Sequence, residues 1–450
     1  MTDLSFLNSG KEFPPKSEEK RLKTYTENNK LFLTEHKEAW GKTFDRFSSR
    51  LKKREIEIDT ILNYHQLLSK KITDFICGEP PAISCNEKTD ELNQILSENK
   101  FDIKLYETII DVSKLGNGVL KIVGSGLSVV DPQYWFPITS ETNKKEIICH
   151  VICYPILPDN EGKPTELYVE IHYIGQIEIR HYAFKDGKIE NLIKTESHKT
   201  EFDDFTIIPL SNITHSGSYY GIDDYQIINS IVEKIMWRLA CADKVLDKHT
   251  EPSLTGPGSA LEYDERTGIW YLPVGNYFKR DTTDDPELKY ITWDGNLEAN
   301  FKEIEMLFEQ LYILSEMGTA FLEGGTTGTA TSGTALKLKM TSPRIKAGRI
   351  VGINSEEVKT AIYLLARVNG LKLERKNITI TWKEGLPNDP IEAVNIAISE
   401  NGGKPLVSHL TSIMKYNEFS EDKAKEELER IMAEDALSVP EILTKGEEFE

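Results

Sequence analysis

The sequence lacks a long apolar run, a cysteine framework and a secretion signal. No stretch is apolar enough to span a membrane, and the mean hydropathy is −0.40. The N-terminal residues contain no apolar signal core, which argues against secretion. The five cysteines are scattered, and Cys149 and Cys153 form no Cys-x-x-Cys pair. These absences argue against a membrane protein, a disulfide scaffold and a zinc site, and they favour reduced cysteines in a cytoplasm.

Motifs for catalysis are missing as well. The glycine-rich residues 116–126 lack the Gly-Lys-Ser/Thr ending of a P-loop and the spacing of a dinucleotide fingerprint, so turns between strands explain them better. The nine histidines contain no His-x-x-x-His pair, and the serines and aspartates form no nucleophile motif. We therefore expect no catalytic residue, no metal and no cofactor.

Charge of one sign dominates the chain. The 450 residues carry 73 acidic and 54 basic side chains, for a net charge of −19. This length suits two to four domains. An acidic surface repels nucleic acid, so only local patches would attract DNA.

The first half of the chain predicts helices followed by strands. Apolar positions recur at helical spacing over residues 17–76, and shorter helices are expected at 89–98 and 103–115. Between residues 118 and 215, β-branched and aromatic residues alternate with polar ones, and residues 185–188 (KDGK) predict a hairpin turn. This part reads as an antiparallel α+β domain.

Two long helices are then expected on either side of a small insert. The first covers residues 223–248, with Asp223 and Asp224 at its start. The insert, 259–296, reads as strands and turns, and the second helix covers 297–317, so the pair should be antiparallel.

Further helices are expected toward the C-terminus. Residues 332–369 predict a third long helix that Pro343 interrupts or kinks. A strand should follow at 377–387, and residues 389–434 read as helical and acidic.

An almost uncharged segment, 319–333, precedes a purely basic one. The first reads TAFLEGGTTGTATSG, and no acid occurs between Glu323 and Glu356. The basic side chains that follow are Lys337, Lys339, Arg344, Lys346 and Arg349. This pattern suggests contact with a polyanion without sequence reading, because the first segment has no amide side chain and, apart from Phe321, no aromatic one to read base edges. A surface loop and a solvated or subunit-paired helix face are the alternatives.

The order of these elements resembles the portal proteins of tailed double-stranded DNA phages. Three local matches accompany it: residues 115–118 (LGNG) running into 129–137 (VVDPQYWFP), residues 331–336 (TSGTAL), and residues 427–431 (ELERI). Each match is weak alone, and their order provides the specificity. The resemblance covers about residues 20 to 435.

The resemblance implies an α+β portal fold that forms rings, typically dodecameric, at one capsid vertex of the virion. It implies that double-stranded DNA passes through without sequence-specific contact. The implied partners are further copies of the chain, terminase, a head-completion adaptor, and the major capsid and scaffolding proteins, with synthesis in the host cytoplasm. The implied domains are a wing (1–222), a stem helix (223–249), a clip (250–296), a second stem helix (297–318), a tunnel loop (319–333), a kinked wing helix with a wing strand (334–388) and an acidic helical crown (389–450).

Specific residues receive roles from this mapping. The DNA-facing loop positions are Thr319, Glu323, Gly324, Gly325, Thr326, Thr327, Gly328, Thr329, Thr331 and Ser332. The DNA-proximal basic residues are Lys337, Lys339, Arg344, Lys346 and Arg349. The docking positions in the clip are Tyr263, Trp270, Tyr271, Tyr277, Lys279, Arg280, Tyr290 and Trp293.

Two other readings stay open on the sequence. A DNA-processing enzyme would need acids clustered on strands to hold metal ions, and the sequence offers no such cluster. A virion adaptor or scaffold protein that forms no ring is the other alternative, and measurement of the assembled mass would separate it from a portal.

Overall fold

The computed structural model describes residues 2–41, 58, 60–157, 163–250, 254–255, 262–271, 289–290, 297–318, 340–383, 408–417 and 421–438. The chain divides into two units. One is Met1–Thr331 with Ala335–Gly385, and the other is Ser332–Thr334 with Leu386–Glu450. None of the helices in the described ranges is long and apolar enough to cross a membrane.

Helices are present in the described part of the first third, and residues 42–57 of the predicted helical region 17–76 lie outside the described residues. These helices are α1 (Glu19–Phe32), α2 (His36–Ala39), α4 (Tyr64–Cys77), α5 (Thr89–Glu98) and α6 (Phe101–Leu115). Helix α6 buries Leu105, Ile109 and Val112 at helical spacing. It ends where Gly116 adopts a φ of 82°, because glycine enters the left-handed region without steric penalty.

Two antiparallel sheets follow, as the alternation predicts. One has the order β3-β2-β9 and the other the order β4-β5-β6-β7-β8. Their strands are β2 (Asn117–Val123), β3 (Gly126–Val130), β4 (Trp135–Thr139), β5 (Ile147–Ile156), β6 (Glu166–Tyr173), β7 (Gln176–Lys185), β8 (Lys188–Lys199) and β9 (Ile207–Ser211). The predicted hairpin turn is confirmed: Asp186 and Gly187 both have positive φ between β7 and β8.

The N-terminal segment packs on one face of the five-stranded sheet. Phe6, Leu7 and Phe13 join a buried cluster with side chains from its strands. Backbone pairing also ties this segment to the edge of β8, where Gly10 N donates to the Ile189 carbonyl over 2.7 Å. A smaller core between the sheets contains Val119, Val130, Trp135, Ile152 and Ile207.

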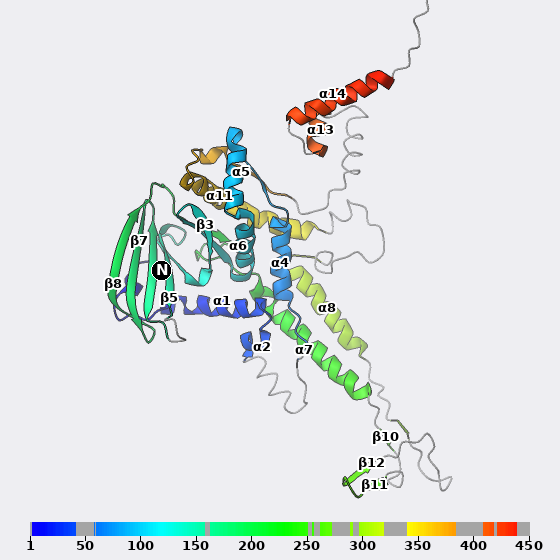
Figure 1. Cartoon of the computed structure of the whole chain (residues 1–450). Coiled ribbons are helices and arrows are strands. Elements are labelled where there is room, and N and C mark those ends of the chain that lie inside the picture. Colours follow the sequence, from blue (N-terminus) through cyan, green and yellow to red (C-terminus); the bar gives the residue numbers. More distant parts are fainter. Residues whose placement is uncertain are drawn as a thin grey trace, which may run out of the picture. The chain divides into compact units, whose positions relative to one another are not determined.

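Two long helices pair in antiparallel fashion, as expected. Helix α7 (Tyr225–Thr250) and helix α8 (Glu298–Leu314) lie side by side (Figure 1). Glu303 of α8 binds Lys234 and Arg238 of α7 at 3.2 and 2.9 Å. The described parts of the insert between the helices are strands: β10 (Leu254–Thr255) pairs with β13 (Lys289–Tyr290), and β11 (Glu262–Asp264) pairs with β12 (Ile269–Tyr271).

The third long helix, α11 (Thr341–Val368), covers the described part of the predicted helix 332–369. Pro343 lies in its first turn, where the missing N–H breaks no intrahelical bond, so the proline neither interrupts nor kinks the described helix. The earlier part of the predicted helix, 332–339, falls outside the described residues. Helix α11 packs on β9 and α4, and Asn354 exchanges two hydrogen bonds with the Ser211 backbone, at 2.7 and 2.8 Å.

The remaining elements are short. Strand β14 (Thr379–Thr381) pairs with β1 (Ala82–Ser84), which confirms the expected strand. In the second unit, α13 (His409–Asn417) contacts α14 (Glu421–Ser438), and both fall in the region expected to be helical.

Candidate functional site at the base of residues 319–339

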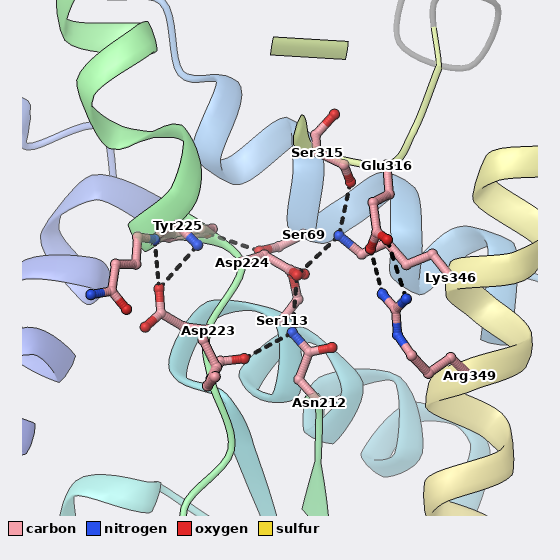
Figure 2. Close-up of polar contacts among 12 residues, drawn as sticks. Ser69, Ser113, Asn212, Asp223, Asp224, Tyr225, Ser315, Glu316, Lys346 and Arg349 are labelled. Atoms are coloured by element: carbon pink, nitrogen blue, oxygen red, sulfur yellow. Dashed lines mark hydrogen bonds and ion pairs between the residues drawn. The ribbon is translucent and has the colours of Figure 1, made fainter. Parts of the chain in front are cut away.

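The candidate site is the place where α7 begins, α8 ends and α11 begins. The last described residues before position 319 follow α8, and the first ones after position 339 lead into α11. Side chains from both ends of this gap meet at the start of α7 (Figure 2). The described residues that flank positions 319–339 therefore lie close together here.

Asp223 caps the first turn of α7. Its Oδ1 accepts hydrogen bonds from the backbone N–H groups of Tyr225 and Gln226 at 3.0 and 2.9 Å. These are two of the donors that a helix start leaves without intrahelical partners. Burial raises the pKa of Asp223 above its usual range.

The next residue, Asp224, forms a buried ion pair with Lys346 of α11. The Lys346 Nζ lies 2.9 Å from Asp224 Oδ1, and the two side chains are 2% and 5% exposed. Asn212 also donates to Oδ1, at 2.9 Å, and Ser113 donates to Oδ2, at 2.7 Å. Because burying a carboxylate and an ammonium is costly unless they are paired and hydrogen-bonded, these contacts offset the desolvation of both groups.

A chain of hydroxyl groups extends this pair toward α4. Ser69 donates to Ser113 Oγ over 3.1 Å, and the Tyr225 hydroxyl lies 2.9 Å from Ser69 Oγ. Since Ser69 has one hydroxyl proton and gives it to Ser113, Tyr225 must donate to Ser69. Every hydroxyl in the chain therefore points its proton toward Asp224.

Lys346 also holds the end of α8. Its Nζ donates to the Ser315 carbonyl oxygen over 3.0 Å (Figure 2). This carbonyl belongs to the last turn of α8, where carbonyls lack intrahelical partners and a cation is favoured by the helix dipole. The next residue, Glu316, has a φ of 60° and pairs with Arg349, whose Nη1 lies 3.2 Å from its Oε1.

The described ones among the five predicted DNA-proximal basic residues differ in their exposure to solvent. Arg344 is exposed in the first turns of α11, whereas Lys337 and Lys339 lie outside the described residues. Arg349 is partly exposed and forms an ion pair with Glu316. Lys346 is a correction, because its ammonium is buried against Asp224 and is not available to DNA.

The other predicted positions fall largely outside the described residues. This holds for the loop residues Thr319, Glu323–Thr329, Thr331 and Ser332, and for Tyr277, Lys279, Arg280 and Trp293 of the insert. Tyr263 is 51% exposed and lies opposite Trp270 in the β11–β12 pair. Tyr271 and Tyr290 lie in β12 and β13.

Several residues of the site were not anticipated. Asp224 was expected only as a helix start, and Ser69, Ser113, Asn212 and Ser315 carried no signal. They come from distant elements of the chain, so no local spacing could have marked them. Across the described ranges, no group of three or more His, Cys, Asp or Glu side chains could hold a metal ion.

Comparison with known proteins gives the family. Two solved structures contain similar chains: one from the neck of an empty gene transfer agent particle computed with C6 symmetry, and one from the virion of a native gene transfer agent particle. The first is 12% identical, with a TM-score of 0.44, and the likeness covers 77% of this chain and 88% of that one. The second is 12% identical, with a TM-score of 0.39, and covers 76% and 85%.

No curated protein matches the sequence. The family model described as "Phage portal protein, SPP1 Gp6-like" matches residues 15–441. Because this match spans most of the 450 residues, the chain belongs to the SPP1 Gp6-like family of phage portal proteins, and its role is structural.

Proposed function

We propose that copies of this chain close into a ring at one capsid vertex and form the conduit for double-stranded DNA during packaging and ejection. The observation that carries the proposal is the family match over residues 15–441. The protein would be made in the host cytoplasm and would then be part of the virion. The ring number expected from the resemblance is that of a dodecamer.

Exposed apolar side chains on the long helices support assembly with further copies. Ile227 of α7 is 52% exposed, and Met306 and Ile313 of α8 are 58% and 64% exposed. Met306 and Ile313 are two helical turns apart, so they lie on the same face of α8. A neighbouring copy packed on this face would remove the apolar surface from water, and a repeated contact between unlike faces closes a ring.

The charge pattern supports a conduit that does not hold DNA tightly. A net charge of −19 disfavours strong phosphate binding, which would oppose sliding. We assign weak, salt-sensitive contact to the loop residues 319–333 and to Lys337, Lys339 and Arg344. Arg349 would contribute less, because Glu316 already neutralises it.

The insert between α7 and α8 is the proposed docking platform. Residues 250–296 would bind terminase during packaging and the head-completion adaptor afterwards, while other surfaces of the ring would meet the major capsid and scaffolding proteins. Tyr263, half-exposed on β11, is the described side chain best placed for such a contact. Exposed aromatic side chains are common anchors at protein interfaces.

Electron microscopy of the purified protein tests the assembly. We expect rings with a central channel, and a protein that stays monomeric or dimeric under all conditions would refute the proposal. Shortening residues 324–331 should leave rings intact and impair DNA packaging or retention. The matched control shortens the exposed turn 140–146 between β4 and β5, which should change neither.

Docking is tested separately from ring formation. Tyr263→Ala should weaken binding of terminase or of the adaptor to preformed rings, measured by co-sedimentation. Arg266→Ala, in the turn of the same β11–β12 hairpin, is the comparison for a general disturbance of this hairpin. Unchanged binding by insert variants would remove the docking assignment and leave the conduit untouched.

A further inference from the structure

We propose that Lys346 is a positioning residue that fixes the end of α8 and the first turns of α11 against the start of α7, and that DNA packaging depends on this geometry. The inference rests on the proposed conduit function. It adds a specific role for one buried cation to which the sequence pattern assigned DNA contact.

The contacts of Lys346 connect three helices at one atom. Its Nζ binds Asp224 Oδ1, just before α7, at 2.9 Å and the Ser315 carbonyl, just after α8, at 3.0 Å. Lys346 itself belongs to α11 and is 2% exposed, so water does not compete for its protons. A shift of any of the three helix ends would lengthen at least one of these bonds.

A charged residue at this point contributes more to fixing the geometry of the helix ends than to the stability of the fold. A buried ion pair loses much of its Coulomb energy to desolvation, and well-packed apolar side chains are often as stabilising. An ammonium group between a carboxylate and a carbonyl imposes distances and directions that apolar packing does not. Its neighbour Arg344 lies two residues earlier in α11 and is exposed, so the anchor also sets the orientation of a proposed DNA-facing charge.

A second pair on the same helix provides the matched control. Arg349 binds Glu316, and the two side chains are 33% and 41% exposed. Exposed ion pairs contribute little because solvent screens them. Both basic residues bind the segment that follows α8, Lys346 through the Ser315 carbonyl and Arg349 through Glu316, but only Lys346 is buried and also pairs with Asp224.

The experiment compares full-length Lys346→Met, the double variant Asp224→Asn/Lys346→Met and the control Arg349→Gln. Four properties are measured: ring assembly, the unfolding midpoint, amide hydrogen exchange at the end of α8 and in the first turns of α11, and the DNA content of particles built with each variant. The exchange reporters are the hydrogen-bonded amides of Ser315, Glu316 and Arg344. Amides of α5 serve as the internal reference.

Lys346→Met should lower the unfolding midpoint, since it removes the cation that pairs with the buried Asp224 carboxylate. Exchange of the three reporter amides should accelerate about tenfold relative to α5, and particle DNA content should fall. The double variant leaves no lone buried charge, so its midpoint should recover toward the parent, while exchange stays fast and DNA content stays low. Arg349→Gln should resemble the parent in ring assembly, unfolding midpoint and amide exchange, and its DNA content should fall less than that of Lys346→Met.

The double variant separates positioning from stability. If it regains slow exchange and full DNA content together with its midpoint, Lys346 serves stability alone and the inference is overturned. If Lys346→Met fails to fold, the comparison of the double variant with the parent still decides between the two roles. Normal DNA filling of particles that lack the protein would instead refute the conduit, and the exchange data would still test Lys346.

Discussion

Lowering the pH from about 7.5 to about 5 should remove about 2 kcal/mol of unfolding free energy through His65 alone. His65 is fully buried on α4, and its Nε2 lies 2.8 Å from Asn229 Oδ1 on α7. An amide oxygen only accepts, so Nε2 carries the proton and Nδ1 accepts from His36 Nε2 over 3.2 Å. Burial, with a smaller effect of His36, lowers the pKa of His65 to about 3.

The sign of the effect follows from this lowered pKa. The unfolded chain has a histidine pKa of about 6.5, so it binds the proton before the folded protein does. The contribution of neutral His65 is therefore complete above about pH 6.5 and is lost as the pH falls toward 3. Burial raises the pKa of Asp111 and Asp223, and these groups act in the opposite direction.

The assay must isolate one histidine from these other groups. We compare denaturant unfolding of the parent and of His65→Gln at the two pH values and at one protomer concentration. Glutamine can both accept and donate at this position but does not titrate. The parent should lose about 2 kcal/mol more than the variant on acidification. Equal losses would mean that His65 is not held neutral, and the reasoning would fail.

Three further predictions concern packing and assembly. Asn354→Ala should reduce the free energy of unfolding by about 2 kcal/mol, since it removes both hydrogen bonds to the Ser211 backbone. Gly116→Ala should reduce it by about 3 kcal/mol or more, since φ is 82° and a Cβ would lie 2.5 Å from the Gly221 carbonyl oxygen. Ile313→Glu should prevent ring assembly, measured as particle mass, by placing a charge on the exposed apolar face of α8.

Each of these has a control in the chain. Ser355→Ala, one position after Asn354, removes only a bond to the preceding turn and should have little effect. Gly187 has a similar φ of 78°, but the space around an added Cβ is open. Gly187→Ala should therefore reduce the free energy of unfolding by only about 1 kcal/mol, through backbone strain. Ile103→Glu makes the same apolar-to-charged change at a 58% exposed position of α6, and rings should still form. Equal effects in a variant and its control would contradict the corresponding mechanism.

Local patterns predicted most of the secondary structure. Helix α5 has the expected bounds. Helices α6, α7 and α8 begin and end within two residues of the expected positions, except that α8 ends three residues earlier. These ends could be predicted because apolar spacing and helix-ending glycines are local features of the sequence. The predicted interruption at Pro343 stays a prediction, because residues 332–339 lie outside the described residues. A proline in the first turn of a helix and one in its interior stand in the same apolar pattern, and only the position of the helix start distinguishes them.

The site was less accessible to sequence reasoning. The basic pattern marked Lys346 by its charge, but the charge alone does not reveal that Asp224 lies against it. The His36–His65 pair was hidden in the same way, since it forms only when α2 and α4 pack together. Burial and partner choice are products of tertiary packing, which no short window of sequence contains.

The N-terminal segment has a consequence for the order in which the chain folds. Phe6, Leu7 and Phe13 complete the core of a sheet whose last strand ends at Lys199. During synthesis these aromatic and aliphatic groups leave the ribosome before β8, and they lack their binding surface until β8 has followed. Contacts between such distant positions slow folding, so a chaperone that shields residues 6–13 of the nascent chain would act at the stage when this protein is most prone to aggregate.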